Sequence, residues 1–155
     1  MMKHSSGVLV YRNNNEKTEV LLCHMGGPFW LGMDEGAWSL PKGEFKNFEK
    51  ALDTAVREFN EETGFNITKQ ELKFLGSKKQ ASNKLVTIFY TNRDYDASKA
   101  ISNMFTREWP KGSGIIKEFP EMDKAEWMDL EQAKEKILKG QIYFINKLET
   151  KIRGL

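Results

Sequence analysis

The chain has 155 residues, of which 39% are hydrophobic and 30% charged, and its formal net charge is +2. This length corresponds to one ordinary domain, residues 1–155, and the composition excludes a disordered chain and a fibrous repeat. The small net charge creates no long-range field for a polyanion, so it does not favour nucleic acid as a partner.

Two strands are predicted near the start of the chain, at 7–11 and 19–24, and a polar turn at 13–15 joins them. The glycines of the next stretch, 26–36, predict a loop that also contains aromatic residues. A short strand is predicted to follow at 37–40.

A helix is predicted from 48 to 62, because four apolar residues share one stripe at helical spacing: Leu52, Ala55, Val56 and Phe59. Asn47 is expected to cap its start, and Gly64 suits the left-handed conformation that ends a helix. Two further strands are predicted at 72–79 and 84–91.

The chain from 92 to 114 is polar and contains glycine, so it is expected to be mostly loop, with strands resuming at 115–119 and 125–128. Asp129 is expected to cap the next helix and Gly140 to end it. A last helix carries an apolar stripe made of Ile142, Ile145, Leu148 and Ile152. The order of elements predicts a mixed sheet with helices packed on it, an α/β or α+β sandwich.

The single cysteine, Cys23, lies in an apolar run, which predicts a buried core thiol rather than a reactive nucleophile. The start of the chain lacks the basic and long apolar segments of a signal peptide. No stretch approaches the roughly 18 apolar residues that a membrane span needs. We therefore expect a cytoplasmic protein without membrane contact.

Three glutamates on the predicted helix carry the most chemical information. Glu58, Glu61 and Glu62 are spaced i, i+3 and i+4, so they share one face, about a quarter turn from the apolar stripe. Three like charges within one turn repel each other, and a divalent cation such as Mg²⁺, which prefers oxygen ligands, would relieve that repulsion. A solvated acidic helix face is the alternative interpretation of these three residues alone.

Two other features support the metal interpretation. Arg57 lies four residues before Glu61 and is able to orient a neighbouring carboxylate by a charge-assisted hydrogen bond. Upstream, the turn at 41–43 brings backbone carbonyls towards the helix, with Gly43 allowing a close approach. One of these carbonyls is a further candidate oxygen ligand.

The whole segment from Gly43 to Phe65 matches the Nudix box, G-x5-E-x7-R-E-U-x-E-E-x-G-U, at every fixed position; only Phe59 is less usual, where an aliphatic residue is commoner. The chain therefore resembles the Nudix hydrolases, and the order of strands and helices extends the resemblance over essentially its full length. The resemblance implies a Nudix-like α/β/α sandwich and a Mg²⁺ cofactor, with Mn²⁺ as a substitute. It also implies metal ligands at Gly43 (backbone), Glu58, Glu61 and Glu62.

In the same family, arginine at the position of Arg57 orients the glutamates, and either Glu58 or a carboxylate from a later loop is the expected general base. Glu49 is expected to have a structural or supporting role. Many members add a carboxylate from a loop before a late strand, and here Glu121 has similar spacing, with Glu118 as the competing residue.

The sequence determines the substrate less well than it determines the metal site. Residues 38–44 resemble the entry to the box in diadenosine polyphosphate hydrolases and in some RNA-end pyrophosphohydrolases. Lys42 is either a phosphate contact or an ordinary surface lysine. Phe29 and Trp30, like Phe105 and Trp109, are either base-stacking residues or plugs beneath a loop.

The resemblance thus predicts a Mg²⁺-dependent pyrophosphohydrolase that cleaves a phosphoanhydride bond of a small nucleoside-diphosphate-linked substrate. Dinucleoside polyphosphates and (d)NTPs are the favoured substrates. The alternatives are an RNA 5′-end pyrophosphohydrolase and a nucleotide-binding Nudix module without activity. The sequence leaves the oligomeric state open, a homodimer included.

Overall fold

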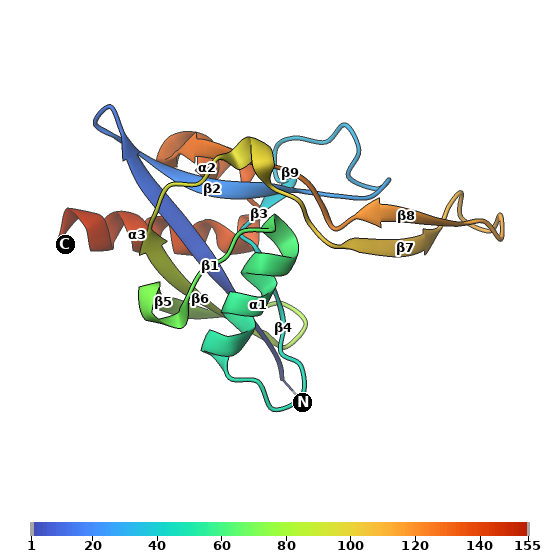
Figure 1. The fold of residues 1–155 in the computed structure, drawn as a ribbon, viewed down its shortest axis with the longest axis horizontal. Coiled ribbons are helices and arrows are strands. Elements are labelled where there is room, and N and C mark those ends of the chain that lie inside the picture. Colours follow the sequence, from blue (N-terminus) through green and yellow to red (C-terminus); the bar gives the residue numbers. More distant parts are fainter. Residues whose placement is uncertain (1, 155) are drawn as a thin grey trace.

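The computed structural model describes residues 2–154, which form a mixed sheet with helices on both faces and a separate hairpin that projects from one side (Figure 1). The sheet contains seven strands: β1 (Lys3–Asn14), β2 (Lys17–Met25), β3 (Trp38–Ser39), β4 (Lys42–Glu44), β5 (Lys73–Gln80), β6 (Lys84–Asn92) and β9 (Met122–Asp129). The hairpin and the helices are β7 (Met104–Glu108), β8 (Ile116–Pro120), α1 (Ala51–Thr63), α2 (Leu130–Lys136) and α3 (Ile142–Arg153). Three short 3-10 turns complete the description: Lys69–Glu71, Ala97–Lys99 and Lys139–Gln141.

The central strand β1 organises the sheet. The main path is β3-β2-β1-β6-β5, with β9 added beside β2 and β4 paired with the first part of β1. The β1–β6 pair is parallel and the other pairs are antiparallel. The predicted mixed sheet is confirmed.

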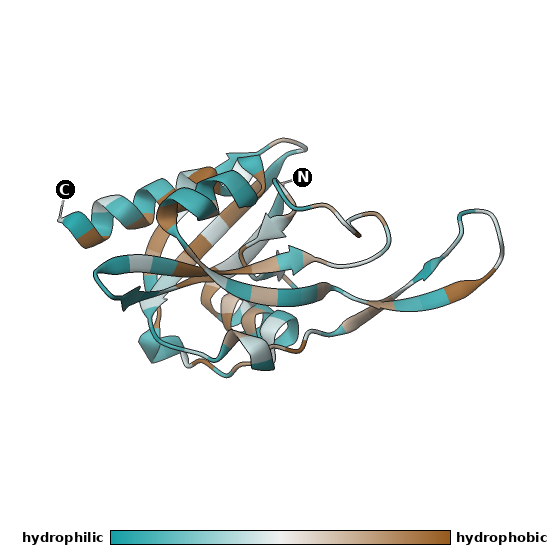
Figure 2. Cartoon of the chain, turned by 90° about the horizontal axis from the view of Figure 1, so that it is seen from above, coloured by the Kyte–Doolittle hydropathy of each residue, from teal (hydrophilic) through white to brown (hydrophobic). Residues whose placement is uncertain are grey.

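Alternation along β1 divides the core into two layers. Val8 and Val10 belong to one buried cluster with Ala55 and Phe59 of α1. Leu9 points the other way, into a cluster that includes residues of α2 and α3: Ala133, Phe144, Ile145 and Leu148. Figure 2 shows the hydrophobic segments gathered in the central strands and on the helix sides that face them. The predicted α/β/α sandwich is confirmed.

Helix α1 starts later than its sequence predicts. Its N-cap is Lys50, so the predicted cap at Asn47 is wrong. The chain makes a turn first, since Phe48 has a φ of 59° and the Glu49 amide donates to the Lys46 carbonyl at 2.8 Å. The predicted end is confirmed: Gly64 is left-handed, with a φ of 78°.

Three other boundaries differ from prediction. The segment from 92 to 114 is not mostly loop at its far end, because β7 pairs with β8. The turn predicted at 41–43 is instead largely strand β4. Helix α2 ends at Lys136 rather than at Gly140, because the chain leaves the helix to pair with β3: the Leu138 amide donates to the Trp38 carbonyl at 2.8 Å.

Two smaller predictions concern Cys23 and the cap of α2. Cys23 is fully buried in β2, as predicted, and burial raises the pKa of its thiol. Asp129 caps α2 by accepting from the Gln132 amide at 2.8 Å, also as predicted. No helix within residues 2–154 is long and apolar enough to cross a membrane.

Candidate active site

Two glutamates of α1 face the short strand β4. Both Glu58 and Glu62 are buried, and the Lys42 amide donates to Oε1 of Glu62 at 3.1 Å. Gly43 lies so close to Glu58 that a Cβ on it would come nearer than 3.0 Å to all three atoms of the carboxylate. Only glycine therefore allows the main chain of β4 to approach the Glu58 side chain in this way.

The burial of these carboxylates disfavours their charged forms. Desolvation raises the pKa of Glu62 well above its usual value, and the negative charge of Glu58 adds to that effect. Desolvation also raises the pKa of Glu58, against the opposing effect of Arg57. Within the described chain, Oε2 of Glu58 is buried without a hydrogen-bond partner. A buried carboxylate oxygen with no partner is costly unless a donor or a cation completes the site.

Arg57 ties four groups together from the outer side of the helix. Its guanidinium donates to both oxygens of Glu49, at 2.8 and 2.9 Å, to Glu58 at 3.2 Å and to Glu61 at 3.0 Å. It also donates to the Glu44 carbonyl at 3.0 Å. The contact with Arg57 lowers the pKa of Glu49 to about 2. Arg57 thus fixes the turn before α1 and two of the predicted metal ligands at once.

Of the two competing late carboxylates, Glu121 lies beside α1. The main chain links them in steps: the Asn103 amide donates to the Glu61 carbonyl at 2.7 Å, and the Glu121 amide donates to the Asn103 carbonyl at 2.9 Å. Desolvation and then the charge of Glu61 raise the pKa of Glu121. Glu118 pairs with Thr106 in the projecting hairpin and is exposed.

The side chains fit a divalent metal in their chemistry rather than in their arrangement. Carboxylate oxygens are the ligands that Mg²⁺ and Mn²⁺ prefer, and the unpartnered oxygen of Glu58 is suited to a cation. Within residues 2–154, however, no three acidic, histidine or cysteine side chains converge on one point. Glu58 and Glu61 instead each direct an oxygen to Arg57.

Lys42 does not point its side chain at the glutamates. It pairs with Gly7, and a Cβ added to Gly7 would overlap the Cβ of Lys42. Both residues therefore face the same side of the sheet, the side that carries α3. There Lys42 lines a hollow of about 230 Å³ that also contains Lys84. Desolvation and then the charge of Lys84 lower the pKa of Lys42. Its amide, rather than its ammonium group, contacts the acidic site.

The two aromatic residues predicted to bind substrate lie in the 26–36 loop. Phe29 has 64% of its surface exposed, whereas Trp30 is half-buried against the core. Their rings meet edge to face, with centroids 5.2 Å apart. Trp30 therefore supports the loop, and Phe29 is the ring available to a ligand.

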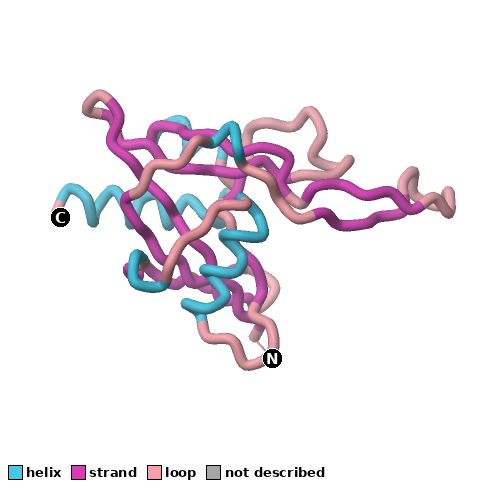
Figure 3. Tube along the Cα trace, in the orientation of Figure 1, coloured by secondary structure: helices cyan, strands magenta, loops and turns pink. Residues whose placement is uncertain are grey.

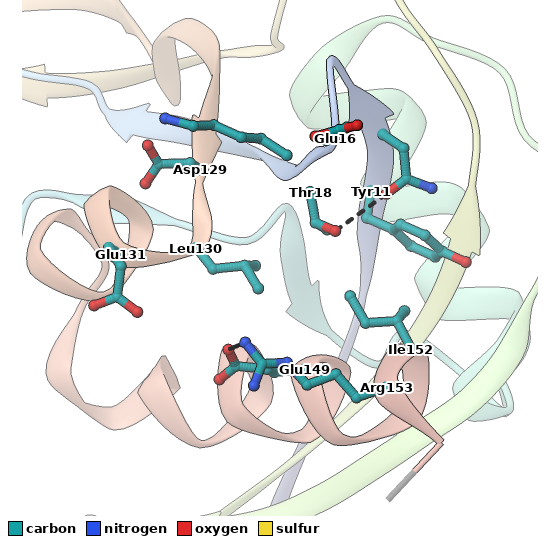
Figure 4. A pocket seen from close by; sticks show the side chains of 11 residues that line it. Tyr11, Glu16, Thr18, Asp129, Leu130, Glu131, Glu149, Ile152 and Arg153 are labelled. Atoms are coloured by element: carbon teal, nitrogen blue, oxygen red, sulfur yellow. Dashed lines mark hydrogen bonds and ion pairs between the residues drawn. The ribbon is translucent and has the colours of Figure 1, made fainter.

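Strand β7 was not predicted, and neither was the hairpin that it forms with β8 beside this loop. This hairpin carries Phe105, Arg107 and Trp109. The glycines of the turn, Gly112 and Gly114, are the only local sequence signal for this hairpin, because residues 104–108 show no apolar alternation. A hollow of about 640 Å³ lies elsewhere, between the β1–β2 turn and the ends of α2 and α3 (Figure 4). It contains none of the predicted site residues.

Comparison with known proteins places the chain in context. A family model described as the NUDIX domain matches residues 3–148. An uncharacterised 17.7 kDa protein from the e-segB intergenic region of phage T4 is 36% identical over 91 residues, which cover 57% of this chain and 59% of the phage protein. The m7GpppN-mRNA hydrolase of Saccharomyces cerevisiae is 25% identical over 122 residues, or 76% of this chain and 11% of that protein. The chain thus spans less than two thirds of the length of either relative.

Among solved structures, an Ap4A hydrolase of C. elegans in a binary complex superposes with a TM-score of 0.65. The match covers 99% of this chain and 100% of the worm protein, at 21% sequence identity. At this identity the likeness establishes the fold alone.

Proposed function

The chain belongs to the NUDIX family, and from this premise we propose that it is a pyrophosphohydrolase that depends on a divalent metal, Mg²⁺ or Mn²⁺. Its reaction would be hydrolysis of a phosphoanhydride bond in a small nucleoside-diphosphate-linked substrate. The observation that carries the proposal is the pair of buried glutamates, Glu58 and Glu62, held against the main chain of β4 with one oxygen left without a partner.

Each residue of the site would have a distinct task. Glu58, Glu61, Glu62 and the backbone of Gly43 would hold the metal. When bound, such a metal neutralises phosphate charge and lowers the pKa of a water molecule. Arg57 limits the rotation of Glu58 and Glu61, and its contacts with Glu49 and the Glu44 carbonyl keep the guanidinium in place.

We assign to Glu58 the task of accepting a proton from the attacking water, with Glu121 as a supporting group. Glu58 is buried, and the charges of Glu61 and Glu121 act on it. Desolvation raises the pKa of its carboxyl in the metal-free site. Glu121 lies beside α1, and backbone hydrogen bonds with Asn103 and Gly26 hold its amide and its carbonyl.

The favoured substrates are dinucleoside polyphosphates or (d)NTPs. The fold likeness to an Ap4A hydrolase supports the first group, without identifying a substrate. An RNA 5′ end is the second candidate, supported by the match to an mRNA hydrolase over 76% of this chain. A non-catalytic module is less favoured, because all three box glutamates and Arg57 are present.

The test is a hydrolysis screen with Mg²⁺ and with Mn²⁺ over dinucleoside polyphosphates, (d)NTPs, nucleotide sugars, ADP-ribose and a 5′-triphosphorylated RNA. We expect metal-dependent turnover of at least one substrate, and a loss of at least roughly a hundredfold in Glu58→Gln and Glu62→Gln. Glu131→Gln is the matched control, because its side chain is 85% exposed on α2. Normal turnover in both site variants would refute the assignment.

A further inference from the structure

A cleft of about 550 Å³ separates the 26–36 loop from the β7–β8 hairpin, two segments that run side by side in Figure 3. We call it the hairpin cleft. Phe29 lines it from the loop, and residues of the hairpin line it from the other side: Thr106, Arg107, Glu108, Trp109 and Lys111. None of the residues that line it belongs to the acidic site.

The loop wall of the cleft is held in place by side chains of the sheet. The buried His24 ring contacts the Met33 carbonyl through Nε2 at 2.6 Å and the Asp123 carboxylate through Nδ1 at 2.9 Å. The Trp38 indole donates to Asp34 at 3.0 Å. These contacts fix the far side of the loop, and on the near side Phe29 packs edge to face on Trp30, which itself packs against the core.

The hairpin wall is also fixed. The Phe105 ring packs on Gly27, where a Cβ would lie 2.9 Å from the ring and where φ is +93°. The turn is tied by Glu108, whose carboxylate accepts from the amides of Gly112 and Gly114 at 2.8 and 3.1 Å. Both walls are therefore formed before any ligand arrives, which lowers the entropic cost of binding.

Two exposed aromatic rings lie on opposite walls. Phe29 is 64% exposed and Trp109 is 37% exposed. Large aromatic side chains are normally buried, and their exposure in one concave site suits a flat apolar ligand. Any nucleobase is able to stack on such rings, because every base has a flat aromatic face.

The same face of the hairpin carries positive charges without partners. The register places Arg107 directly opposite Lys117, and like charges in that position destabilise a strand pair. Within residues 2–154 neither side chain forms an ion pair. Lys111 adds a third cation at the rim, while the carboxylate of Glu108 is occupied by the turn amides. An anion between the strands would relieve this repulsion.

The cleft lies away from the acidic site, on the far side of the base of the hairpin. The base of the hairpin touches α1 through the hydrogen bond from Asn103 to Glu61. From Asn103 to Trp109 the extended chain covers on the order of 20 Å, at about 3.3 Å per residue. A ligand that reaches both places must therefore be long, with phosphates at α1 and a base far from the bond that is cleaved.

We propose that the hairpin cleft binds the second nucleotide of a dinucleoside polyphosphate, with its base between Phe29 and Trp109 and its phosphate against Arg107 and Lys117. This inference rests on the proposed function and decides between its two favoured substrate groups. The cleft favours substrates with a nucleotide on each side of the polyphosphate, and a nucleoside triphosphate leaves it empty.

The test compares the kcat/KM for diadenosine tetraphosphate with that for ATP in Trp109→Ala and Phe29→Ala. Each change should lower kcat/KM for diadenosine tetraphosphate roughly 5- to 100-fold, the range for loss of one base–aromatic stack, and leave that for ATP unchanged. Ile116→Ala is the matched control, since Ile116 is an exposed apolar residue on the opposite face of the same hairpin. Thermal unfolding of each variant checks that the fold persists.

A second measurement separates this inference from the proposed function. Equilibrium binding of a non-hydrolysable analogue of diadenosine tetraphosphate in the presence of Mg²⁺ requires no hydrolysis, and Arg107→Glu should weaken it while Lys73→Glu, at an exposed position of β5, should not. Absence of any hydrolysis by the wild-type protein would overturn the proposed function but leave this binding measurable. Equal losses of kcat/KM for ATP and for diadenosine tetraphosphate would overturn the assignment of the hairpin cleft to the second nucleotide. An effect of Ile116→Ala as large as that of Trp109→Ala would overturn it as well. A response seen only with a 5′-triphosphorylated oligonucleotide would overturn the choice of a dinucleoside polyphosphate.

Discussion

Replacing Gly43 with alanine tests whether the close approach of β4 to Glu58 is needed for catalysis. The added Cβ would fall within 3.0 Å of the carbon and both oxygens of the Glu58 carboxylate. Ordinary contact with a Cβ begins at about 3.4 Å, so the carboxylate has to move by more than about 1 Å. The backbone of Gly43 is not left-handed, and the effect of alanine is therefore steric alone.

A displacement of about 1 Å at a reacting group costs on the order of a hundredfold in rate. Overpacking also costs roughly 1–3 kcal/mol in the free energy of unfolding. We therefore expect Gly43→Ala to fold with a lower Tm and to lose about a hundredfold in metal-dependent kcat, measured on the best substrate of the screen. The control is Gly76→Ala, where the nearest atom to a new Cβ is 3.6 Å away. Equal kcat values in the two variants would show that the reasoning about Glu58 is mistaken.

Three further predictions follow from other contacts. Arg57→Lys should lower both kcat and Tm, because lysine cannot replace the paired contact with Glu49; an unchanged Tm in a melting experiment would contradict this role. Glu121→Gln should reduce kcat while Glu118→Gln should not, because only Glu121 lies beside α1, and steady-state kinetics of the pair decides between them. Cys23 should react with a disulfide reagent only as fast as the protein unfolds. The free energy of unfolding should also fall as pH rises above about 8.5, because the thiol of the unfolded chain then loses its proton and the buried thiol does not. Reaction of the native protein at the rate of a free thiol would contradict the burial.

The sequence predicts those parts of the fold that depend on local pattern. The apolar stripe of α1, the strand at 7–11 and the glycine after α1 are each determined within a few residues, and each is confirmed. The start of α1 could not be predicted in the same way. Its position depends on the turn at Phe48 and on the contact between Glu49 and Arg57, which are eight residues apart.

The parts that escaped prediction depend on distant partners. Helix α2 is cut short because residues after Lys136 pair with β3, about a hundred residues earlier in the chain. Strand β7 is short and polar, and only its partner β8 defines it. The same distinction holds in the site. The box residues of α1 are adjacent in sequence, whereas the direction of Lys42 depends on its pairing with Gly7.

The central claim is that the glutamates of α1 hold a divalent metal. Equilibrium binding of Mn²⁺, followed by electron paramagnetic resonance, tests this claim without the need to know the substrate. We expect saturable Mn²⁺ binding by the wild-type protein and by Glu131→Gln, and its loss when Glu58 and Glu62 are both replaced by glutamine. Equal Mn²⁺ binding by the wild-type protein and the double variant would contradict it.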